Sequence, residues 1–96
     1  MIKSFRGKGI EDIYNGEISR YALKIPLELH NKIRRLLDQI NAAHNIADLR
    51  IPPGNNLEAL HGDLLHFWSI RVNRQYRIMF QWESGNAYEV EVLDYH

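Results

Sequence analysis

The sequence predicts an α+β fold in which helices come first and an antiparallel sheet comes last. Apolar residues recur at helical spacing in the first half of the chain and at alternate positions from residue 67 onward. The stretch "RIPPGNN" separates the two halves with helix-breaking proline and glycine. A helix and a sheet that are each apolar on one face bury those faces against one another. We expect one domain over residues 1–96, because a chain of this length supports one modest core.

The first half of the chain is expected to hold a short strand and two helices. Residues 2–5 are typical of a strand, and residues 9–16 predict a short helix that ends at an Asn-Gly cap. The main helix is expected over residues 25–43, with Pro26 in its first turn, where the missing N–H of proline does no harm. The apolar face of this helix consists of Leu29, Ile33, Leu36, Leu37 and Ile40.

The second half predicts three strands, over residues 67–73, 76–82 and 87–96, joined by tight loops into an antiparallel meander. The main helix and its neighbours should cover the apolar face of this sheet. The expected apolar sets of the three strands are Trp68, Ile70 and Val72, then Tyr76, Ile78, Phe80 and Trp82, then Tyr88, Val90 and Val92.

The pairing of the first two strands follows from the requirement that their apolar faces coincide. A three-residue loop at 73–75 meets this requirement and places Arg71 opposite Arg77 on the other face. Two like charges side by side in a sheet repel one another. The arginine pair therefore needs an anion or a neighbouring acid.

The second hairpin brings the end of the chain toward these arginines. A three-residue loop at 84–86 would place Phe80 opposite Val90 and Arg77 opposite Leu93. Residues 94–96 then return to the arginine end of the sheet.

Composition excludes several classes of function. Twelve basic and twelve acidic residues cancel, so the strong positive field of many proteins that bind free nucleic acid is missing. There is no cysteine, which fits a reducing compartment, and no apolar run approaches the length of a membrane span. We expect a cytoplasmic protein with no membrane contact.

Charge is nevertheless concentrated locally. Beyond residue 60, the only lysines or arginines are Arg71, Arg74 and Arg77, and they lie within seven residues of one another. Arginines bind phosphate, and His61 and His96 have the natural pKa range for proton transfer. These are the groups that cleavage of RNA by its own ribose 2′-hydroxyl requires, without a metal ion or cofactor.

Other histidines give no sign of a metal site. His61 and His66 are five positions apart and no carboxylate pattern accompanies them. His30 and His44, on or beside the main helix, are expected at the surface.

The whole chain resembles the HigB toxins, the "host inhibition of growth" branch of the RelE-like toxins. The resemblance rests on "MIKSF", "LDQINAA", "LRIPPGNNLEALHGD", "WSIRVNRQYRIMFQW" and the terminal "LDYH". It implies the RelE-like fold and an endonuclease that cuts messenger RNA in the ribosomal A site. It also implies neutralisation by a helix-turn-helix antitoxin of the HigA type, through which alone DNA would be contacted.

The resemblance assigns roles to individual residues. The closing Asp-Tyr-His of the family falls on Asp94, Tyr95 and His96, and its strand arginines fall on Arg77 and Arg71. The resemblance implies that the arginines stabilise phosphate, that His96 with Asp94 handles protons and that Tyr95 positions or stacks a base. Asp94 has the parity of core positions, so a structural role is an equal alternative, and Tyr95 could also be an edge aromatic.

Two positions depart from the family pattern. His61 stands where members often have lysine, and Glu58 stands where some have histidine. His61 is expected among the catalytic residues, and Glu58 lies with Arg71 and Arg74 at the expected RNA-binding surface. A carboxylate there repels phosphate, and a histidine is charged only near or below its pKa.

Two alternatives to the nuclease remain, one from the shared fold and one from the altered positions 58 and 61. The same fold serves toxins that poison gyrase and cleave nothing, which do not need the terminal Asp-Tyr-His. The other alternative is a weakened toxin that persists as an antitoxin-binding module.

Overall fold

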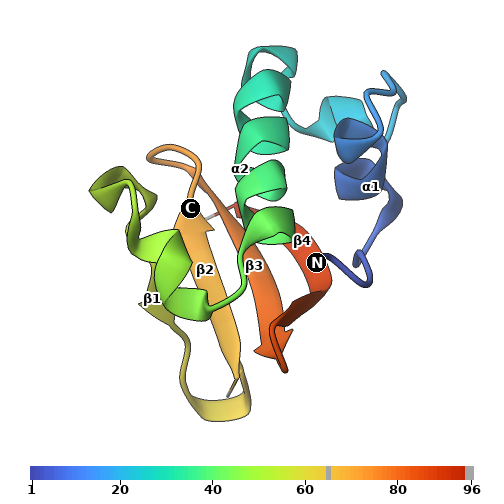
Figure 1. Ribbon diagram of the computed structural model, residues 1–96. Helices are drawn as coiled ribbons and strands as arrows, with labels where there is room; N and C mark the ends of the chain where they lie inside the picture. Colours follow the sequence, from blue (N-terminus) through green and yellow to red (C-terminus); the bar gives the residue numbers. More distant parts are fainter. Residues whose placement is uncertain (65, 95–96) are drawn as a thin grey trace.

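The computed structural model describes residues 1–64 and 66–94 and has two layers (Figure 1). Helix α2 lies across one face of a four-stranded antiparallel sheet of order β1-β2-β3-β4, and α1 lies beside α2 near β4. This arrangement confirms the α+β prediction. The bounds are α1 Lys8–Tyr14, α2 His30–Ala42, β1 Glu58–Ala59, β2 Phe67–Arg71, β3 Tyr76–Glu83 and β4 Asn86–Asp94.

The core forms between α2 and the sheet, as the two periodicities predict. Ile33 and Leu37 of α2 are fully buried, as are Ile70 and Ile78 of the sheet. Burying one such side chain stabilises the fold by about 1.5–3 kcal/mol. Because α2 occupies this face, the opposite face of the sheet is left to carry the polar side chains of β2 and β3.

The β2–β3 register is the predicted one, with Arg71 opposite Arg77 and Ile70 opposite Ile78. The turn is held by Asn73, whose side-chain oxygen accepts hydrogen bonds from the backbone N–H groups of Gln75 and Tyr76, at 2.9 and 2.8 Å. Asparagine favours such turns because its side chain satisfies the turn's own backbone donors.

The β3–β4 hairpin corrects the prediction at its loop end. Its loop has two residues rather than three, since Glu83 pairs with Asn86. Next to the loop, the residue numbers of paired positions therefore add up to an odd number, whereas the prediction required an even one. A β-bulge at Glu89, whose φ is 53°, restores the predicted register beyond it. Phe80 consequently lies opposite the bulge and is not directly paired with Val90, its predicted partner.

The bulge also changes which residue faces the core. Ala87 pairs with Trp82 and is fully buried, whereas Tyr88 pairs with Gln81 and is only half-buried. Tyr88 was expected in the apolar set, and this expectation is wrong because the two-residue loop shifts the parity of the strand start. Nearer the end of the chain, Arg77 pairs with Leu93 as predicted.

The first residues lie along the outer edge of β4. Ile2 and Phe5 form parallel bridges to Ala87 and Val90, in place of the continuous short strand expected over 2–5. The edge is covered only as far as Val90, whose carbonyl accepts the N–H of Arg6 at 2.8 Å. In the other direction, the sheet gains the short strand β1, which the sequence did not reveal.

His30 corrects a second expectation, because it is buried, 3% exposed, at the start of α2. Its Nε2 lies 3.0 Å from the carbonyl oxygen of Ala22 and 2.9 Å from that of Ile25. A histidine N–H can satisfy such carbonyls, so His30 ties the segment before α2 to the helix. His44 is exposed as expected.

Among the described residues, no helix has both the length and the apolar content that a membrane crossing requires.

Candidate active site

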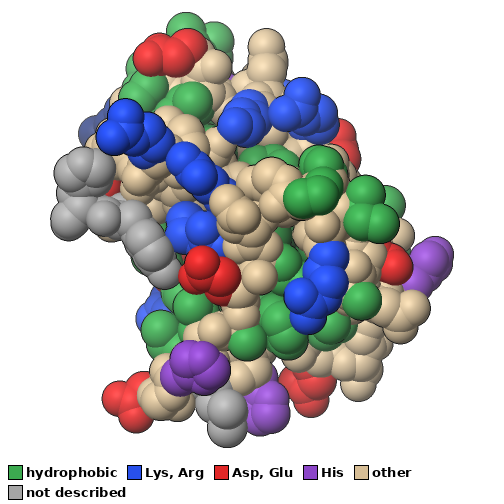
Figure 2. Space-filling view, turned by 90° about the vertical axis from the view of Figure 1, so that its left-hand side faces the viewer, with side chains coloured by type: hydrophobic (Ala, Val, Ile, Leu, Met, Phe, Trp, Pro, Cys, Tyr) green, Lys and Arg blue, Asp and Glu red, His purple; other side chains and the backbone are tan. Residues whose placement is uncertain are grey.

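A cleft of about 400 Å³ opens on the face of the sheet away from α2. Figure 2 looks onto this side of the molecule, where Lys and Arg side chains gather in the upper half of the view beside a small acidic patch. Among the described residues, three arginines against one glutamate give the cleft an excess of two positive charges. The described residues that line it are Asn56, Glu58, Arg71, Asn73, Arg74 and Arg77.

Arg77 is the buried centre of the cleft. Its side chain is 7% exposed, and its Nε donates a 2.9 Å hydrogen bond to the hydroxyl of Ser69. Its Nη2 donates to the backbone carbonyls of Asn56 and, at 3.2 Å, of Ser69. Because the guanidinium is planar and rigid, these bonds fix its orientation. Burial of a charge is tolerable only with such compensation.

Arg71 and Arg74 extend the positive charge from Arg77 toward the end of the sheet. Arg71 is directly opposite Arg77 and half-buried, and Arg74 is exposed on the turn that Asn73 holds. Two arginines at directly opposed positions of a sheet repel one another unless an anion lies between them. The cleft is therefore suited to a phosphate group, which arginine binds in a bidentate manner.

The end of β4 is joined to this same turn. Asp94 pairs with Tyr76 and accepts a 3.1 Å hydrogen bond from the side chain of Gln75. Asp94 alternates with the core residues of its strand, yet it is exposed because it lies at the end of the strand. The chain thus reaches the arginine end at Asp94, whereas the predictions for Tyr95 and His96 lie outside the described residues.

The two positions that depart from the family pattern are separated. Glu58 lies on β1 opposite Ser69 and lines the cleft. His61 follows β1, is exposed, and is not among the described residues that line the cleft. Of the residues predicted from the sequence, the structure brings together Arg77, Arg71, Arg74 and Glu58, and it leaves His61 apart.

Sequence reasoning missed three residues of the site: Ser69, Asn56 and Asn73. Ser69 is fully buried on the non-core face, and its parity with Arg71 was the available signal. Asn56 contributes a backbone carbonyl from a left-handed conformation, with φ 46°, after Pro53–Asn55. No local pattern could reveal that this carbonyl meets an arginine 21 positions away.

Comparison with known proteins places the chain in a family. Residues 3–96 match the family described as the RelE-like toxin of the type II toxin-antitoxin system HigB. The chain is 45% identical to "Toxin HigB-1" of Vibrio cholerae over 87 residues, covering 91% of this chain and 90% of the relative. It is 33% identical to "Endoribonuclease HigB" of Proteus vulgaris over the full length of both.

A solved structure shares the fold at low sequence identity. It is a YoeB-YefM complex from Staphylococcus aureus, which superposes with a TM-score of 0.58 at 16% identity and covers 100% of this chain and 98% of the other. The family match over residues 3–96 and the two named relatives show that this chain belongs to the HigB-like, RelE-like toxins of type II toxin-antitoxin systems.

Proposed function

We propose that this chain is a ribosome-dependent endoribonuclease that cuts messenger RNA in the ribosomal A site, with residues 1–96 acting as one toxin domain. The observation that carries the proposal is the arginine-lined cleft, in which buried Arg77 lies opposite Arg71. The relative from Proteus vulgaris named as an endoribonuclease supports the same chemistry.

The proposed reaction uses the substrate's own nucleophile. The ribose 2′-hydroxyl loses its proton to a base and attacks the adjacent phosphorus, the bond to the 5′-oxygen breaks, and an acid protonates that oxygen. The products are a 2′,3′-cyclic phosphate and a 5′-hydroxyl. Such a reaction needs no metal ion, because the protein has only to move two protons and offset the added charge on phosphate.

The arginines are proposed to stabilise that charge. Arg77 is held by Ser69 and Asn56, so it meets the phosphate without having to reorganise. Arg71 and Arg74 complete the phosphate-binding surface, and Glu58 lines the same cleft.

Protons are proposed to move through His96, oriented by Asp94, while Tyr95 stacks on a base. His61 is the second candidate proton carrier. Support for the C-terminal group is the return of β4 to the arginine end, where Asp94 is bonded to Gln75.

The partners are proposed to be the ribosome with its message and a HigA-type helix-turn-helix antitoxin, with DNA reached only through the antitoxin. A net charge of zero fits an enzyme whose substrate is held by the ribosome, because free RNA is gripped mainly by excess positive charge.

Primer extension on a translated message after induction of the toxin tests the proposal. We expect discrete cuts within codons that disappear when the antitoxin is co-expressed or translation is blocked. Arrested replication without cuts would instead support a gyrase poison. No effect on growth would support a weakened antitoxin-binding module, which the carboxylate of Glu58 inside the cleft favours over the gyrase poison.

A further inference from the structure

A second positively charged cleft, of about 250 Å³, lies between α2 and the loop that precedes β1. It shares Arg71 with the first cleft, and the consecutive residues Asn55 and Asn56 line the second and the first cleft respectively. The two clefts are therefore neighbours on one side of the molecule. The residues of the second cleft are Lys32, Arg35, Leu36, Gln39, Pro52, Gly54, Asn55 and Arg71.

One wall of the second cleft is held in place by hydrogen bonds of Asn55. Asn55 is 3% exposed, and its side-chain nitrogen donates 3.1 Å hydrogen bonds to the side chain of Gln39 and to the carbonyl of Leu49. These bonds attach the loop to α2. The loop wall of the cleft is therefore held against α2, the helix that carries Lys32 and Arg35.

The next feature of this cleft is the lack of ion-pair partners for its two α2 cations among the described residues. Lys32 and Arg35 are exposed and lie three positions apart on α2, hence on one side of the helix. Within residues 1–64 and 66–94, neither belongs to an ion pair, and no carboxylate lines the cleft. Arg34 is different, because it donates to the carbonyl of Ile13 and to Asn31. Among the described residues, Lys32, Arg35 and Arg71 thus line a concave wall without a carboxylate, and such a wall is suited to an anion.

We propose that Lys32, Arg35 and Arg71 form a second binding site for RNA phosphates, adjoining the cleavage cleft. This inference rests on the proposed nuclease function: the strand cut at Arg77 would continue over Arg71 to α2, or ribosomal RNA would enter from the α2 side. Lysine and arginine on a phosphate backbone contribute affinity without reading sequence. The site therefore holds the enzyme in place and leaves the position of cutting to the first cleft.

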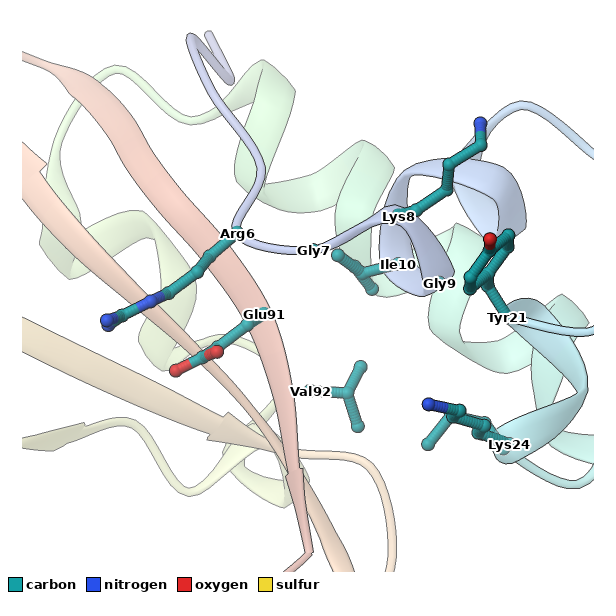
Figure 3. A pocket seen from close by; sticks show the side chains of 10 residues that line it. Arg6, Gly7, Lys8, Gly9, Ile10, Tyr21, Lys24, Glu91 and Val92 are labelled. Atoms are coloured by element: carbon teal, nitrogen blue, oxygen red, sulfur yellow. The ribbon is translucent and has the colours of Figure 1, made fainter.

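A different groove provides the matched control. Figure 3 shows it at the edge of β4, with Val92 at its centre and Arg6 and Lys24 from other segments around it. Glu91 also lines this groove, and its Lys8 is already paired with Asp12 at 3.0 Å. The control therefore contains an acid and a neutralised lysine, whereas the proposed site contains neither.

The test compares the double variant Lys32→Ala/Arg35→Ala with the control Arg6→Ala/Lys24→Ala, which removes the same charge. Binding of fluorescently labelled toxin is measured to ribosomes carrying a 2′-O-methylated message, over a range of salt concentrations. We expect binding on the order of tenfold weaker for the double variant, with a shallower salt dependence, by about 1.4 in the log–log slope for two single-strand phosphates. The control should stay within twofold of the wild type.

Two further arms identify the source of the phosphates. If the message supplies them, the defect vanishes on vacant ribosomes; if ribosomal RNA supplies them, it persists there. In cleavage assays the double variant should raise KM and keep kcat and the cut sites, because uniform binding is lost.

Equal losses in the double variant and the control, or no loss in either, would overturn the inference. So would weaker antitoxin binding by the double variant with ribosome binding intact, since the occupant would then be an acidic protein segment. A wild type that binds ribosomes through this site but cuts no message would overturn the proposed nuclease alone.

Discussion

At the scale of single residues, the site is defined by how Arg77 is held. A buried cation with two backbone carbonyls and a serine hydroxyl as acceptors is costly to desolvate and well compensated. Such fixed orientation is what electrostatic stabilisation of a transition state requires, because the charge need not move into place during the reaction.

Replacing Arg77 by lysine should lower kcat/KM for message cleavage by about 10²-fold, although the charge remains. A lysine ammonium cannot span the acceptors at Ser69 and Asn56 and also face a phosphate. The measurement is cleavage of a defined message on purified ribosomes, with Arg50→Lys, at an exposed position, as the matched control. Activity within twofold of the wild type would contradict a specific role for the guanidinium.

Replacing Ser69 by alanine should reduce kcat by about tenfold and change KM little. The variant leaves the Nε of Arg77 without its hydroxyl acceptor, which costs about 1–3 kcal/mol for a buried donor. Thermal unfolding of the same preparation separates a positioning effect from a loss of structure. An unchanged kcat with a lowered Tm would mean that Ser69 only supports the fold.

The sequence predicted the arginines of the site and not their supports. Arg71 and Arg77 followed from strand parity, which depends only on alternation along each strand. The carbonyl of Asn56 comes from a loop 21 positions away, and its approach to Arg77 depends on the path of that loop rather than on any local pattern. Glu58 was predicted at this surface from the family resemblance alone, because the two-residue strand β1 that carries it left no pattern in the sequence.

At the scale of elements, long periodic segments were predicted well and their junctions were not. Helix α2 and the β2–β3 pairing follow the 3.6- and 2-residue periods. The β3–β4 loop was predicted one residue too long, because a bulge at Glu89 compensates for the parity of a two-residue turn. A bulge adds a residue without changing the apolar pattern on either side, so the pattern alone cannot reveal it.

The packing of α1 against the segment before α2 depends on Gly9. A Cβ at this position would lie 2.8 Å from the backbone oxygen of Tyr21. Gly9→Ala should therefore lower the free energy of unfolding by about 1–3 kcal/mol, the usual cost of overpacking. Chemical denaturation measures this change. Gly54→Ala is the control, since nothing lies within 4 Å of its Cβ, and equal stability of the two variants would contradict the close packing.

At the scale of the whole molecule, stability should decline in acid. The hydroxyl of Ser19 donates a 2.6 Å hydrogen bond to the buried carboxylate of Asp12. This bond is the main cause that lowers the pKa of Asp12 below its usual value of 3.8, and Lys8 lowers it further. Because the folded-state pKa is the lower one, the stabilisation is present above about pH 3.8 and is lost as the pH falls through the folded pKa.

In the variant Asp12→Asn, the free energy of unfolding should fall less steeply as the pH is lowered. It should also be smaller near neutral pH, because the ion pair with Lys8 is lost. Unfolding free energies measured from pH 6 downward in steps would show the difference. Asp63→Asn, which removes the same charge from an exposed position, should keep the wild-type slope. An identical slope in Asp12→Asn would mean that other carboxyls govern acid unfolding.

The parallel bridges of Ile2 and Phe5 to β4 cover an edge of the sheet that another copy of the chain could otherwise pair with. Without residues 2–5, the N–H groups of Val90 and Glu89 and the carbonyl of Ala87 lose their partners, and the outer strand of the sheet becomes a bare edge. Such an edge pairs readily with another chain. Light scattering should find a chain lacking residues 2–5 self-associating at concentrations where the intact chain stays dispersed. The first few residues would then act as a built-in guard against aggregation.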